Sequence, residues 1–514
     1  MRRQGYDVVV CGAGLAGAST AYHLQQTHPP VRVAMVDSRP PLSLTSSRST
    51  ECYRDYWPSE CMVNLMDRSI AKIHAIHNQL MESEGREGCG LSLCQKGYSF
   101  FADTDEASSR LMGSVDHFHR MGRPVREVRA DDAVGDDGLS GHGLDVYDGP
   151  ESVRKHYPWA GEGMRGCLKA KRCGWLDAQR LGGFFLEEAK RRGLEVIRGE
   201  VVGVDISSSR EGQVVTIRRD NTASPTQLSC PTLVLAGGPF LPSLLSLINA
   251  PPFPLPAAAA AALTLLPPRV FPFLVNEVHA KVILKDTLGL MPQDHPNAGM
   301  QLYSDSQVLD WPAVFREDPQ GFLSLLRETE GGMPVEMELV DRLLGRLADG
   351  AHFRPYRPDR LLIIWDVMHD GLQVTHPPPP EPSLYTSLYP EVAVRGIQRL
   401  IPRLSAYLGQ LKQLCSVDGG YYCKAPDNRP VIGPLPTQPS VIICGGLGGF
   451  GVMASPAAGE LAALHVMKRV SGWTDDSGAS FPSYTEAFLP SRFCSEVYLN
   501  EVCGPSNAGK RGQI

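Results

Sequence analysis

The chain alternates short apolar runs with longer amphipathic stretches, a pattern typical of folds that mix strands and helices. Residues 6–11 form a valine-rich apolar run, and residues 31–36 form a second one, so each predicts a buried strand. Apolar positions recur at helical spacing in residues 62–80 and again in residues 178–192, which Gly193 ends. The N-terminal part therefore predicts strands and helices in alternation.

The turn after the first strand has the pattern G-x-G-x-x-G, and Asp37 follows its last glycine by twenty residues. Gly12 permits a tight turn, Gly14 lets a pyrophosphate approach the backbone, and Gly17 lets helix and strand pack closely. Asp37 can accept hydrogen bonds from ribose hydroxyls, and the start of the helix offers N–H groups to phosphates. This stretch predicts a dinucleotide site that fits NAD and FAD equally well.

A second glycine cluster lies far along the chain. Residues 440–444 read as a buried strand, residues 445–451 are mostly glycine, and residues 454–468 are helical in pattern. Residues 233–238 also run from an apolar strand into small residues. A bare backbone before a helix N-terminus suits a flat or anionic ligand, so both stretches are expected near the dinucleotide.

The middle of the chain predicts an excursion into a second domain. Residues 276–284 alternate as a strand with His279 and Lys281 on one face. Residues 130–149 read as a polar loop and residues 390–411 as a helix, and the Pro/Ala-rich residues 251–272 predict the crossing between domains. We assign residues 1–95, 160–250 and 405–470 to the first domain, residues 96–159 and 251–404 to the second, and residues 471–514 to a tail whose end is disordered.

Composition narrows the class of protein. The 514 residues are 42% hydrophobic and 21% charged, as in ordinary globular proteins. A net charge of −6 gives no basic field for nucleic acid, so a small-molecule partner is expected. The 13 cysteines form no C-x-x-C pair, the N-terminus leaves no room for a secretory signal, and the longest apolar run is too short for a transmembrane segment of about 20 residues. We expect a cytoplasmic enzyme without a metal site, because His74 and His77 have no third ligand nearby.

Three blocks of the chain, residues 12–37, 174–238 and 422–459, resemble the FAD-dependent amine and amino-acid oxidoreductases of the D-amino-acid oxidase superfamily. That group includes sarcosine oxidase, glycine oxidase and dimethylglycine dehydrogenase. The most specific part is the closing block, with Asp-x-Arg-Pro-x-Ile-Gly at residues 427–433 and its glycine cluster. The resemblance implies an α/β fold (α+β overall), in which a Rossmann-type FAD-binding domain, discontinuous in sequence, carries an inserted substrate domain with a mixed or antiparallel sheet.

The resemblance also implies how the chain holds FAD. The first glycine turn and Asp37 would hold the adenosine diphosphate half, hydroxyl side chains after the second strand would cap phosphate or ribityl oxygens, and the second glycine cluster would lie at the pyrimidine edge of the flavin. The implied residues are Gly12, Gly14, Leu15, Ala16, Gly17, Asp37, Ser46, Ser47, Thr50, Val202, Ala236, Gly237, Gly448, Gly449, Phe450 and Gly451.

Departures from the family pattern concern covalent attachment and the substrate carboxylate. Members with covalent flavin have a cysteine at the place of Gly420, and Cys423 lies three residues further on, so non-covalent FAD is predicted. Sarcosine oxidases have lysine at the place of Met453 and histidine at that of Phe450, and glycine oxidase has arginine at that of Tyr422. The usual carboxylate clamp is thus largely missing.

Four residues are candidates for substrate chemistry. Arg54 aligns with a carboxylate-binding arginine of sarcosine oxidases, although a salt bridge to Glu51 or Asp55 explains it equally well. Lys281 could assist oxygen activation and His279 could accept a proton, or both could lie on an ordinary surface strand. Tyr422 could line the pocket as a hydrogen-bond donor or simply pack in the core.

The predicted reaction is FAD-dependent oxidation of a CH–NH bond in an amine or N-substituted amino acid, by hydride transfer to flavin N5. O2 or an electron-carrier protein would accept the electrons. One alternative is oxidation of a CH–OH bond in a hydroxy acid, and another is a non-catalytic assembly protein that flavin stabilises.

Overall fold

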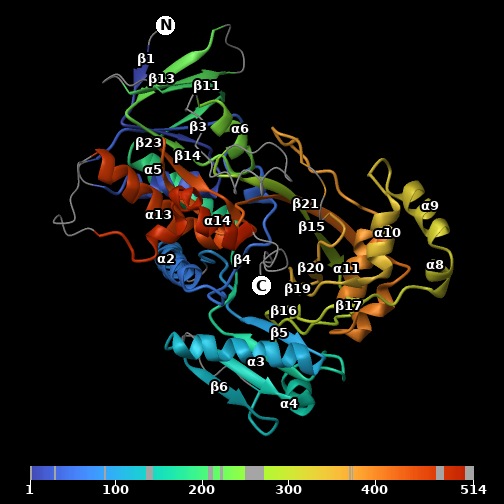
Figure 1. Cartoon of the computed structure of the whole chain (residues 1–514). Coiled ribbons are helices and arrows are strands. Elements are labelled where there is room, and N and C mark those ends of the chain that lie inside the picture. The colour runs from blue at the N-terminus through green and yellow to red at the C-terminus, as the bar shows by residue number, and fades with distance from the viewer. Residues whose placement is uncertain are drawn as a thin grey trace.

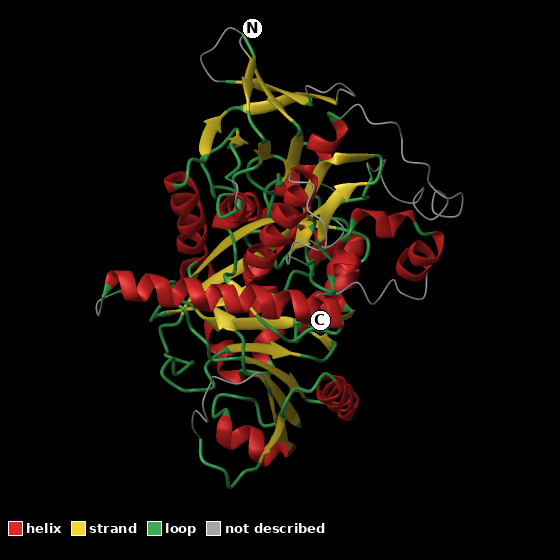
Figure 2. Cartoon of the chain, turned by 90° about the vertical axis from the view of Figure 1, so that its left-hand side faces the viewer, coloured by secondary structure: helices red, strands yellow, loops and turns green. Residues whose placement is uncertain are grey.

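The computed structural model describes residues 3–27, 30–85, 88–134, 143–206, 212–219, 224–248, 271–369, 372, 374–470 and 480–503. The Pro/Ala-rich stretch up to residue 270 and the end of the tail, residues 504–514, lie outside the described residues. Helices and strands are mixed throughout the molecule (Figure 2), as the sequence predicted for its fold class.

The fold has two halves, each built on a large sheet, and a six-stranded sheet forms the core of one of them. Its order is β10-β3-β2-β14-β23-β22, with five parallel strands and an antiparallel β22 at one edge. The opening motif thus lies two strands away from the strand that precedes the second glycine cluster. The strands are β2 (Val8–Cys11), β3 (Val33–Asp37), β10 (Glu195–Arg198), β14 (Thr232–Leu235), β22 (Val431–Leu435) and β23 (Gln438–Gly445).

One layer of structure covers each face of this sheet, and the side chains of β2 point alternately into the two layers. Val8 and Val10 belong to a core cluster with four helices, whereas Val9 and Cys11 belong to a cluster with a small four-stranded sheet. The helices are α1 (Leu15–Leu24), α2 (Glu60–Glu84), α5 (Ala178–Arg191) and α13 (Gly451–Val470), and the small sheet contains β1 (Arg3–Gly5), β13 (Thr226–Cys230), β12 (Gln213–Arg218) and β11 (Glu200–Ile206).

The other half of the fold is built on a ten-stranded mixed sheet that runs from the centre of Figure 1 to its lower edge. Its pairs are antiparallel except β16 with β5 and β6 with β7, which confirms the mixed sheet that the resemblance implied. In order, the strands are β24 (Leu447–Gly448), β21 (Cys415–Lys424), β15 (Val275–Lys285), β20 (Arg360–Ile364), β19 (Ala351–Pro355), β16 (Met300–Tyr303), β5 (Tyr98–Ala102), β8 (Gly166–Ala170), β7 (Leu144–Asp148) and β6 (Val125–Val128).

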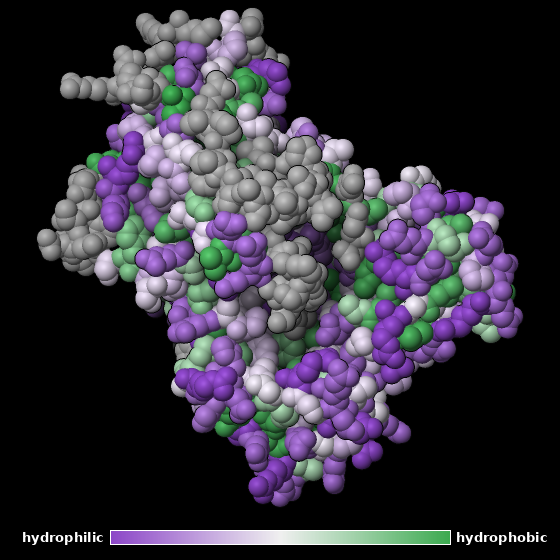
Figure 3. Space-filling view, viewed as in Figure 1, coloured by the Kyte–Doolittle hydropathy of each residue, from purple (hydrophilic) through white to green (hydrophobic). Residues whose placement is uncertain are grey.

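The remaining helices and short strands complete the described part of the chain. In the space-filling view, hydrophilic side chains cover much of the lobe formed by α8, α9 and α10, with apolar ones interspersed (Figure 3). The helices are α3 (Asp105–Arg120), α4 (Gly149–His156), α6 (Leu241–Ser246), α8 (Ala313–Glu317), α9 (Pro319–Thr329), α10 (Met337–Leu344), α11 (Tyr389–Gln398), α12 (Leu411–Leu414) and α14 (Glu496–Cys503), and the short strands are β4 (Cys52–Tyr53), β9 (Gly174–Trp175), β17 (Gln307–Val308) and β18 (Arg346–Leu347).

Two local predictions were wrong. The polar loop expected over residues 130–149 contains β7, whose backbone pairs with β8 on one side and β6 on the other. The helix expected over residues 390–411 ends at Gln398, and a 3-10 helix, Pro402–Tyr407, follows it, since the proline ring cannot continue an α-helical ladder. The ten-stranded sheet also includes β8 and β21, whose residues the predicted boundaries give to the first domain.

None of the helices in the described part of the chain combines the length and the apolar composition needed to cross a membrane.

Candidate active site

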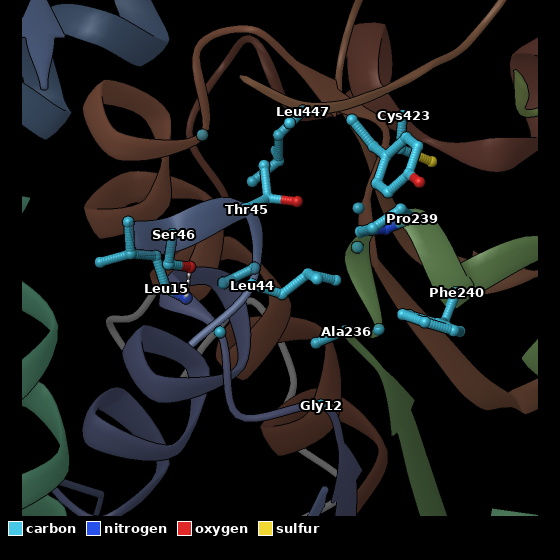
Figure 4. Close-up of a pocket in the computed structure, with 18 of the residues that line it drawn as sticks. Gly12, Leu15, Leu44, Thr45, Ser46, Ala236, Pro239, Phe240, Cys423 and Leu447 are labelled. Atoms are coloured by element: carbon cyan, nitrogen blue, oxygen red, sulfur yellow. Dashed lines mark hydrogen bonds between the residues drawn. The ribbon is translucent and has the colours of Figure 1, made fainter. Parts of the chain in front are cut away.

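A cavity of about 900 Å³ opens where the six-stranded sheet meets β15 and β21 of the ten-stranded sheet. Its wall is formed by the first glycine turn, the loop of residues 36–50, residues 236–247 and the second glycine cluster, as the close-up shows for part of it (Figure 4). The carboxyl ends of β2, β14 and β23 point at the cavity, which is where ligands bind in open α/β sheets.

The three glycines of the opening motif have different surroundings. Gly12 has φ +112°, and a β-carbon there would lie 2.4 Å from the carbonyl oxygen of Ala236. A β-carbon on Gly17 would lie 2.0 Å from the carbonyl oxygen of Gly12. At Gly14 the nearest atom is Ser46 Oγ at 3.3 Å, and Gly14 lines the cavity. Two glycines thus permit close backbone packing, while the third leaves space for a ligand.

Asp37 and Ser46 bind the backbone of this turn. Asp37 Oδ2 accepts a hydrogen bond from Ala13 N at 2.7 Å, and its Oδ1 accepts one from Arg39 N at 2.9 Å. Leu15 N, in the first turn of α1, donates to Ser46 Oγ at 3.2 Å. No side chain caps the helix from Gly14, so its N-terminal dipole faces the cavity with a single hydroxyl beside it.

The polar atoms of the loop after β3 include a buried hydroxyl group. Thr45 Oγ1 is buried and has no hydrogen-bond partner in the protein, and Figure 4 shows it among the side chains that surround the cavity. A buried hydroxyl without a partner is costly unless a ligand or water satisfies it. This atom suits a ligand with polar groups along its length.

The second glycine cluster closes the opposite wall. Gly446 and Gly448 have positive φ angles of 63° and 52°, and α13 begins at Gly451 with its N-terminus at the cavity. Two helix N-termini and a run of backbone amides therefore line the same space. Such a wall stabilises negative charge on a bound group.

Side chains from β15 and β21 form a polar face on the remaining wall. The antiparallel register sets Lys281 opposite Asp418, His279 opposite Gly420 and Glu277 opposite Tyr422. Because side chains alternate along a strand, all of these belong to one face. His279, Lys281 and Tyr422 line the cavity.

His279 lies between two carboxylates and against an aromatic ring. Its ring stacks on Tyr422 with centroids 3.8 Å apart and planes 15° apart. Its Nε2 is 3.5 Å from Glu277 Oε2, and its Nδ1 is 3.9 Å from Asp366 Oδ2. Burial raises the pKa of Glu277, but the hydrogen bond to His279 and the ammonium of Lys424 outweigh burial and lower that pKa to about 2.

Lys281 and Arg48 share a carboxylate. Lys281 Nζ is 2.8 Å from Asp418 Oδ2, and Arg48 also pairs with Asp418 and with Glu381 at 2.7 Å. Burial raises the pKa of Asp418, yet its bonds to Lys281 and Arg48 dominate and lower it. Both cations therefore already have acidic partners at the cavity wall.

Arg54 does not lie in the cavity wall. Its side chain is buried, and its guanidinium lies 4.2 Å from the centre of the Trp57 ring, which meets Phe450 edge-on at 5.0 Å. Burial lowers the pKa of Arg54. Glu51 and Asp55, the two partners considered for it, pair with Arg354 at 3.4 Å and with Arg123 at 2.8 Å. Arg54 is therefore not among the residues that line the cavity, whereas His279, Lys281 and Tyr422 are.

Comparison with known proteins assigns the chain to a family. The family model of the FAD-dependent oxidoreductases called DAO matches residues 7–293 and 314–464. The chain belongs to this family. It is thus an FAD-dependent oxidoreductase, which accounts for a dinucleotide-sized cavity with two glycine turns.

Solved structures with the same fold include several oxidoreductases. L-proline dehydrogenase from P. horikoshii is 19% identical with a TM-score of 0.60, and the match covers 96% of this chain and 98% of that one. Glycine oxidase from Bacillus cereus is 16% identical (TM-score 0.56, covering 91% and 96%), and L-alpha-glycerophosphate oxidase from Mycoplasma pneumoniae is 13% identical (TM-score 0.55, covering 92% and 96%). No curated protein matches the chain.

The residues present fit the cofactor of the DAO family. Gly14 leaves open space at a helix N-terminus for the pyrophosphate, and Thr45 presents a buried hydroxyl without a partner. When bound, FAD supplies the hydride acceptor. The predicted cofactor residues that line the cavity are Gly12, Gly14, Leu15, Ala16, Asp37, Ser46, Thr50, Val202, Ala236, Gly237, Gly448, Gly449 and Gly451, whereas Gly17, Ser47 and Phe450 do not line it.

Several residues of this DAO-family site were missed. Glu277 shares the alternation of His279, so the strand pattern could have identified it. Thr45 lies in the hydroxyl-rich loop from which its neighbours were chosen. Asp366 and Asp418 could not be found, because only the pairing of β15 with β20 and β21 brings them to His279 and Lys281. No group of residues in the described ranges could hold a metal ion.

Proposed function

We propose that the protein oxidises a CH–NH bond of an amine or N-substituted amino acid. Bound FAD would supply N5 as the acceptor for the hydride on the carbon next to nitrogen, and the imine product would hydrolyse in water. O2 or an electron-carrier protein accepts the electrons. The observation that carries the proposal is His279, which stacks on Tyr422 in the cavity wall between the carboxylates of Glu277 and Asp366.

Oxidation of an amine needs the free base, because a protonated nitrogen cannot support the developing imine. A neutral His279 imidazole can accept the proton from the substrate ammonium. Glu277 and Asp366 lie 3.5 and 3.9 Å from its two ring nitrogens, so a proton that the ring accepts lies beside two carboxylates. Tyr422 holds the ring plane by stacking.

Buried hydrogen bonds fix the orientation of Asp366. Its Oδ2 accepts from the backbone of Ala280, and its Oδ1 accepts from the side chain and backbone of His369. His369 Nε2 accepts from Tyr385 N at 3.0 Å, so the ring proton of His369 is assigned to Nδ1, which donates to Asp366. These bonds hold the Asp366 carboxyl group in place 3.9 Å from His279.

Two cations of the cavity wall already have an acidic partner. Lys281 of β15 and Arg48 of the loop of residues 36–50 both line the cavity and share Asp418. A substrate carboxylate would have to compete with that acid. Simple amines are therefore expected among the substrates as well as amino acids.

The flavin is proposed to be held without a covalent bond. Gly420, at the position of the attachment cysteine in other members, has no side chain. Burial raises the pKa of the nearby Cys423 thiol to about 12, which keeps it neutral and a poor nucleophile. Acid precipitation of the holoprotein should leave the yellow colour in the supernatant.

A second candidate reaction is oxidation of a CH–OH bond. Among the similar structures, glycine oxidase and L-proline dehydrogenase are named for substrates with a CH–NH bond, whereas L-alpha-glycerophosphate oxidase is not. A histidine can also act as a general base toward a hydroxyl group, although a hydroxyl gives up its proton less readily than an ammonium group does. His279 therefore supports both reactions, and substrate panels must separate them.

The test is anaerobic bleaching of the oxidised flavin band. The purified holoprotein is mixed with primary amines, N-methyl amines, N-methyl amino acids and cyclic amino acids, and with matched 2-hydroxy acids and polyols. Bleaching by at least one CH–NH compound but no alcohol supports the proposal. Bleaching by alcohols alone favours the second candidate. A yellow protein that none of the compounds bleaches indicates a non-catalytic role. A colourless protein contradicts every flavin-dependent function considered.

A further inference from the structure

A C-terminal segment beyond the family match contacts the cofactor-site turn. The family model ends at residue 464, whereas residues 480–503 pack against the half of the fold that is built on the six-stranded sheet, with Leu499 of α14 buried in the core cluster on the small-sheet face (Figure 1). Phe488 and Phe493 are fully buried in the two core clusters on opposite faces of the six-stranded sheet. This segment is thus an integral part of the packed structure.

Its polar contacts converge on Asp427. Arg492 Nε lies 2.7 Å from Asp427 Oδ2, and the same guanidinium also donates to Asp427 Oδ1 at 3.0 Å and to the carbonyl oxygen of Arg429 at 3.2 Å. Tyr498 Oη donates to Asp427 Oδ2 at 2.6 Å. The Arg492 and Asp427 side chains are only 6% and 3% exposed, so the pair is bidentate and almost dry.

The turn that these contacts hold adjoins the cofactor cavity. Residues 425–430 connect β21 of the ten-stranded sheet with β22 of the six-stranded sheet. Asp427 closes the turn by accepting from Arg429 N at 3.1 Å, and Asn428 between them has φ +53°. Asn428 Oδ1 is 3.3 Å from the position of a β-carbon on Gly448, which lines the cavity.

We propose that Arg492 and Tyr498 are positioning residues for the FAD site. They hold the Asp427 turn, and the turn fixes the backbone at Gly448, where the family places the flavin ring. Binding of FAD and docking of residues 480–503 are then coupled, and by linkage each stabilises the other equally. This proposal does not depend on which substrate is oxidised.

The first test measures FAD affinity of the full-length chain after flavin removal. Arg492→Met leaves the Asp427 carboxylate buried without its ion pair, so FAD should bind about tenfold more weakly. Tyr498→Phe removes one hydrogen bond and should weaken binding by about threefold. Val497→Ala, at a side chain of the same helix that is 69% exposed, is the matched control and should bind FAD as the wild type does.

The second test uses amide hydrogen exchange, first on the wild-type chain and then on Arg492→Met. FAD added to the flavin-free wild-type chain should slow exchange in residues 485–499, and Arg492→Met should remove most of that protection. If Arg492→Met does not fold, Tyr498→Phe and the wild-type exchange decide the question. Unchanged FAD affinity in Tyr498→Phe, together with exchange in residues 485–499 that FAD does not affect, would overturn the proposal. A lower melting temperature with unchanged affinity would show a purely structural role and overturn it as well.

Discussion

At the residue scale, the chemistry proposed for the cavity wall depends on His279. His279→Gln removes the proton acceptor but keeps a polar side chain, so anaerobic flavin reduction by an amine should slow by about 10²-fold. FAD affinity should stay the same. Stopped-flow absorbance measures the rate of flavin reduction. His119→Gln, on the exposed face of α3, is the control, and an unaltered rate in His279→Gln would remove histidine from the mechanism.

Asp366 contributes through His279, so its replacement should slow flavin reduction without changing FAD affinity. Asp366→Asn keeps the shape but removes the carboxylate 3.9 Å from the imidazole. We expect flavin reduction by an amine to slow by about tenfold, because positive charge that develops on the ring loses a neighbouring anion. Asp359→Asn, at a side chain 56% exposed, should leave the rate unchanged. An unchanged rate in Asp366→Asn would exclude this coupling.

Gly14 tests the cofactor site at the level of one side chain. The structure leaves open space beside Gly14, with only Ser46 Oγ at 3.3 Å from a β-carbon, so Gly14→Val should fold but fill the pyrophosphate path. FAD should be lost from the purified protein, as its visible spectrum reports. Gly163→Val, at a glycine without neighbours around its β-carbon position, should retain FAD. Full flavin occupancy in Gly14→Val would refute the assignment.

At the element scale, Arg354 of β19 supports the end of the loop of residues 36–50, which forms part of the cavity wall. It is buried, donates to the carbonyl oxygen of Thr50 at 2.9 and 3.2 Å, and pairs with Glu51, which has φ +65°. Arg354→Met leaves Glu51 without its arginine and should lower the free energy of unfolding by about 3 kcal/mol. Urea denaturation measures this loss. Arg360→Met, at the exposed start of β20, should cost less than about 1 kcal/mol, and equal losses in both variants would contradict the supporting role.

The strand β15 shows how much of a site can be predicted from the alternation of side chains along a strand. The sequence set His279 and Lys281 on one face of residues 276–284, and the structure has both in the cavity wall. It could not identify Asp418, because the register between β15 and β21 depends on packing across about 140 residues of chain. Arg54 shows the converse limit. Its alignment suggested a carboxylate clamp, but whether a side chain reaches a cavity depends on neighbours such as Trp57.

At the scale of the whole molecule, the predictable parts were those with a local physical signature. Two glycine turns more than 400 residues apart meet at one cavity, because β2 and β23 both pair with β14. Each turn was recognisable from its own strand, glycines and helix. The ten-stranded sheet was predicted only as a class, since its strand order joins segments from residues 98 to 448 through non-local pairing that no single stretch encodes.

Buried histidines in both halves predict how the molecule responds to acid. Burial lowers the pKa of His23 on α1 and of His352 on β19 to about 4, below the value of about 6.5 for an exposed imidazole. Between these values the unfolded chain binds more protons than the native one, so the free energy of unfolding falls as pH drops from about 6.5 to 4. Each histidine accounts for up to about 3 kcal/mol of that fall.

Glu277 acts in a different window, which separates the two effects. Its folded pKa of about 2 lies below the ordinary 4.5, so the stability it contributes is lost only as pH falls below about 4.5. Melting temperatures of the holoprotein measured from pH 7.5 to 4.5 should therefore decline mainly through the histidines. The double variant His23→Gln/His352→Gln should be less stable at pH 7.5, because both rings donate to backbone carbonyl oxygens, yet its melting temperature should change less with pH. A decline as steep as that of the wild type would show that other groups cause the acid sensitivity.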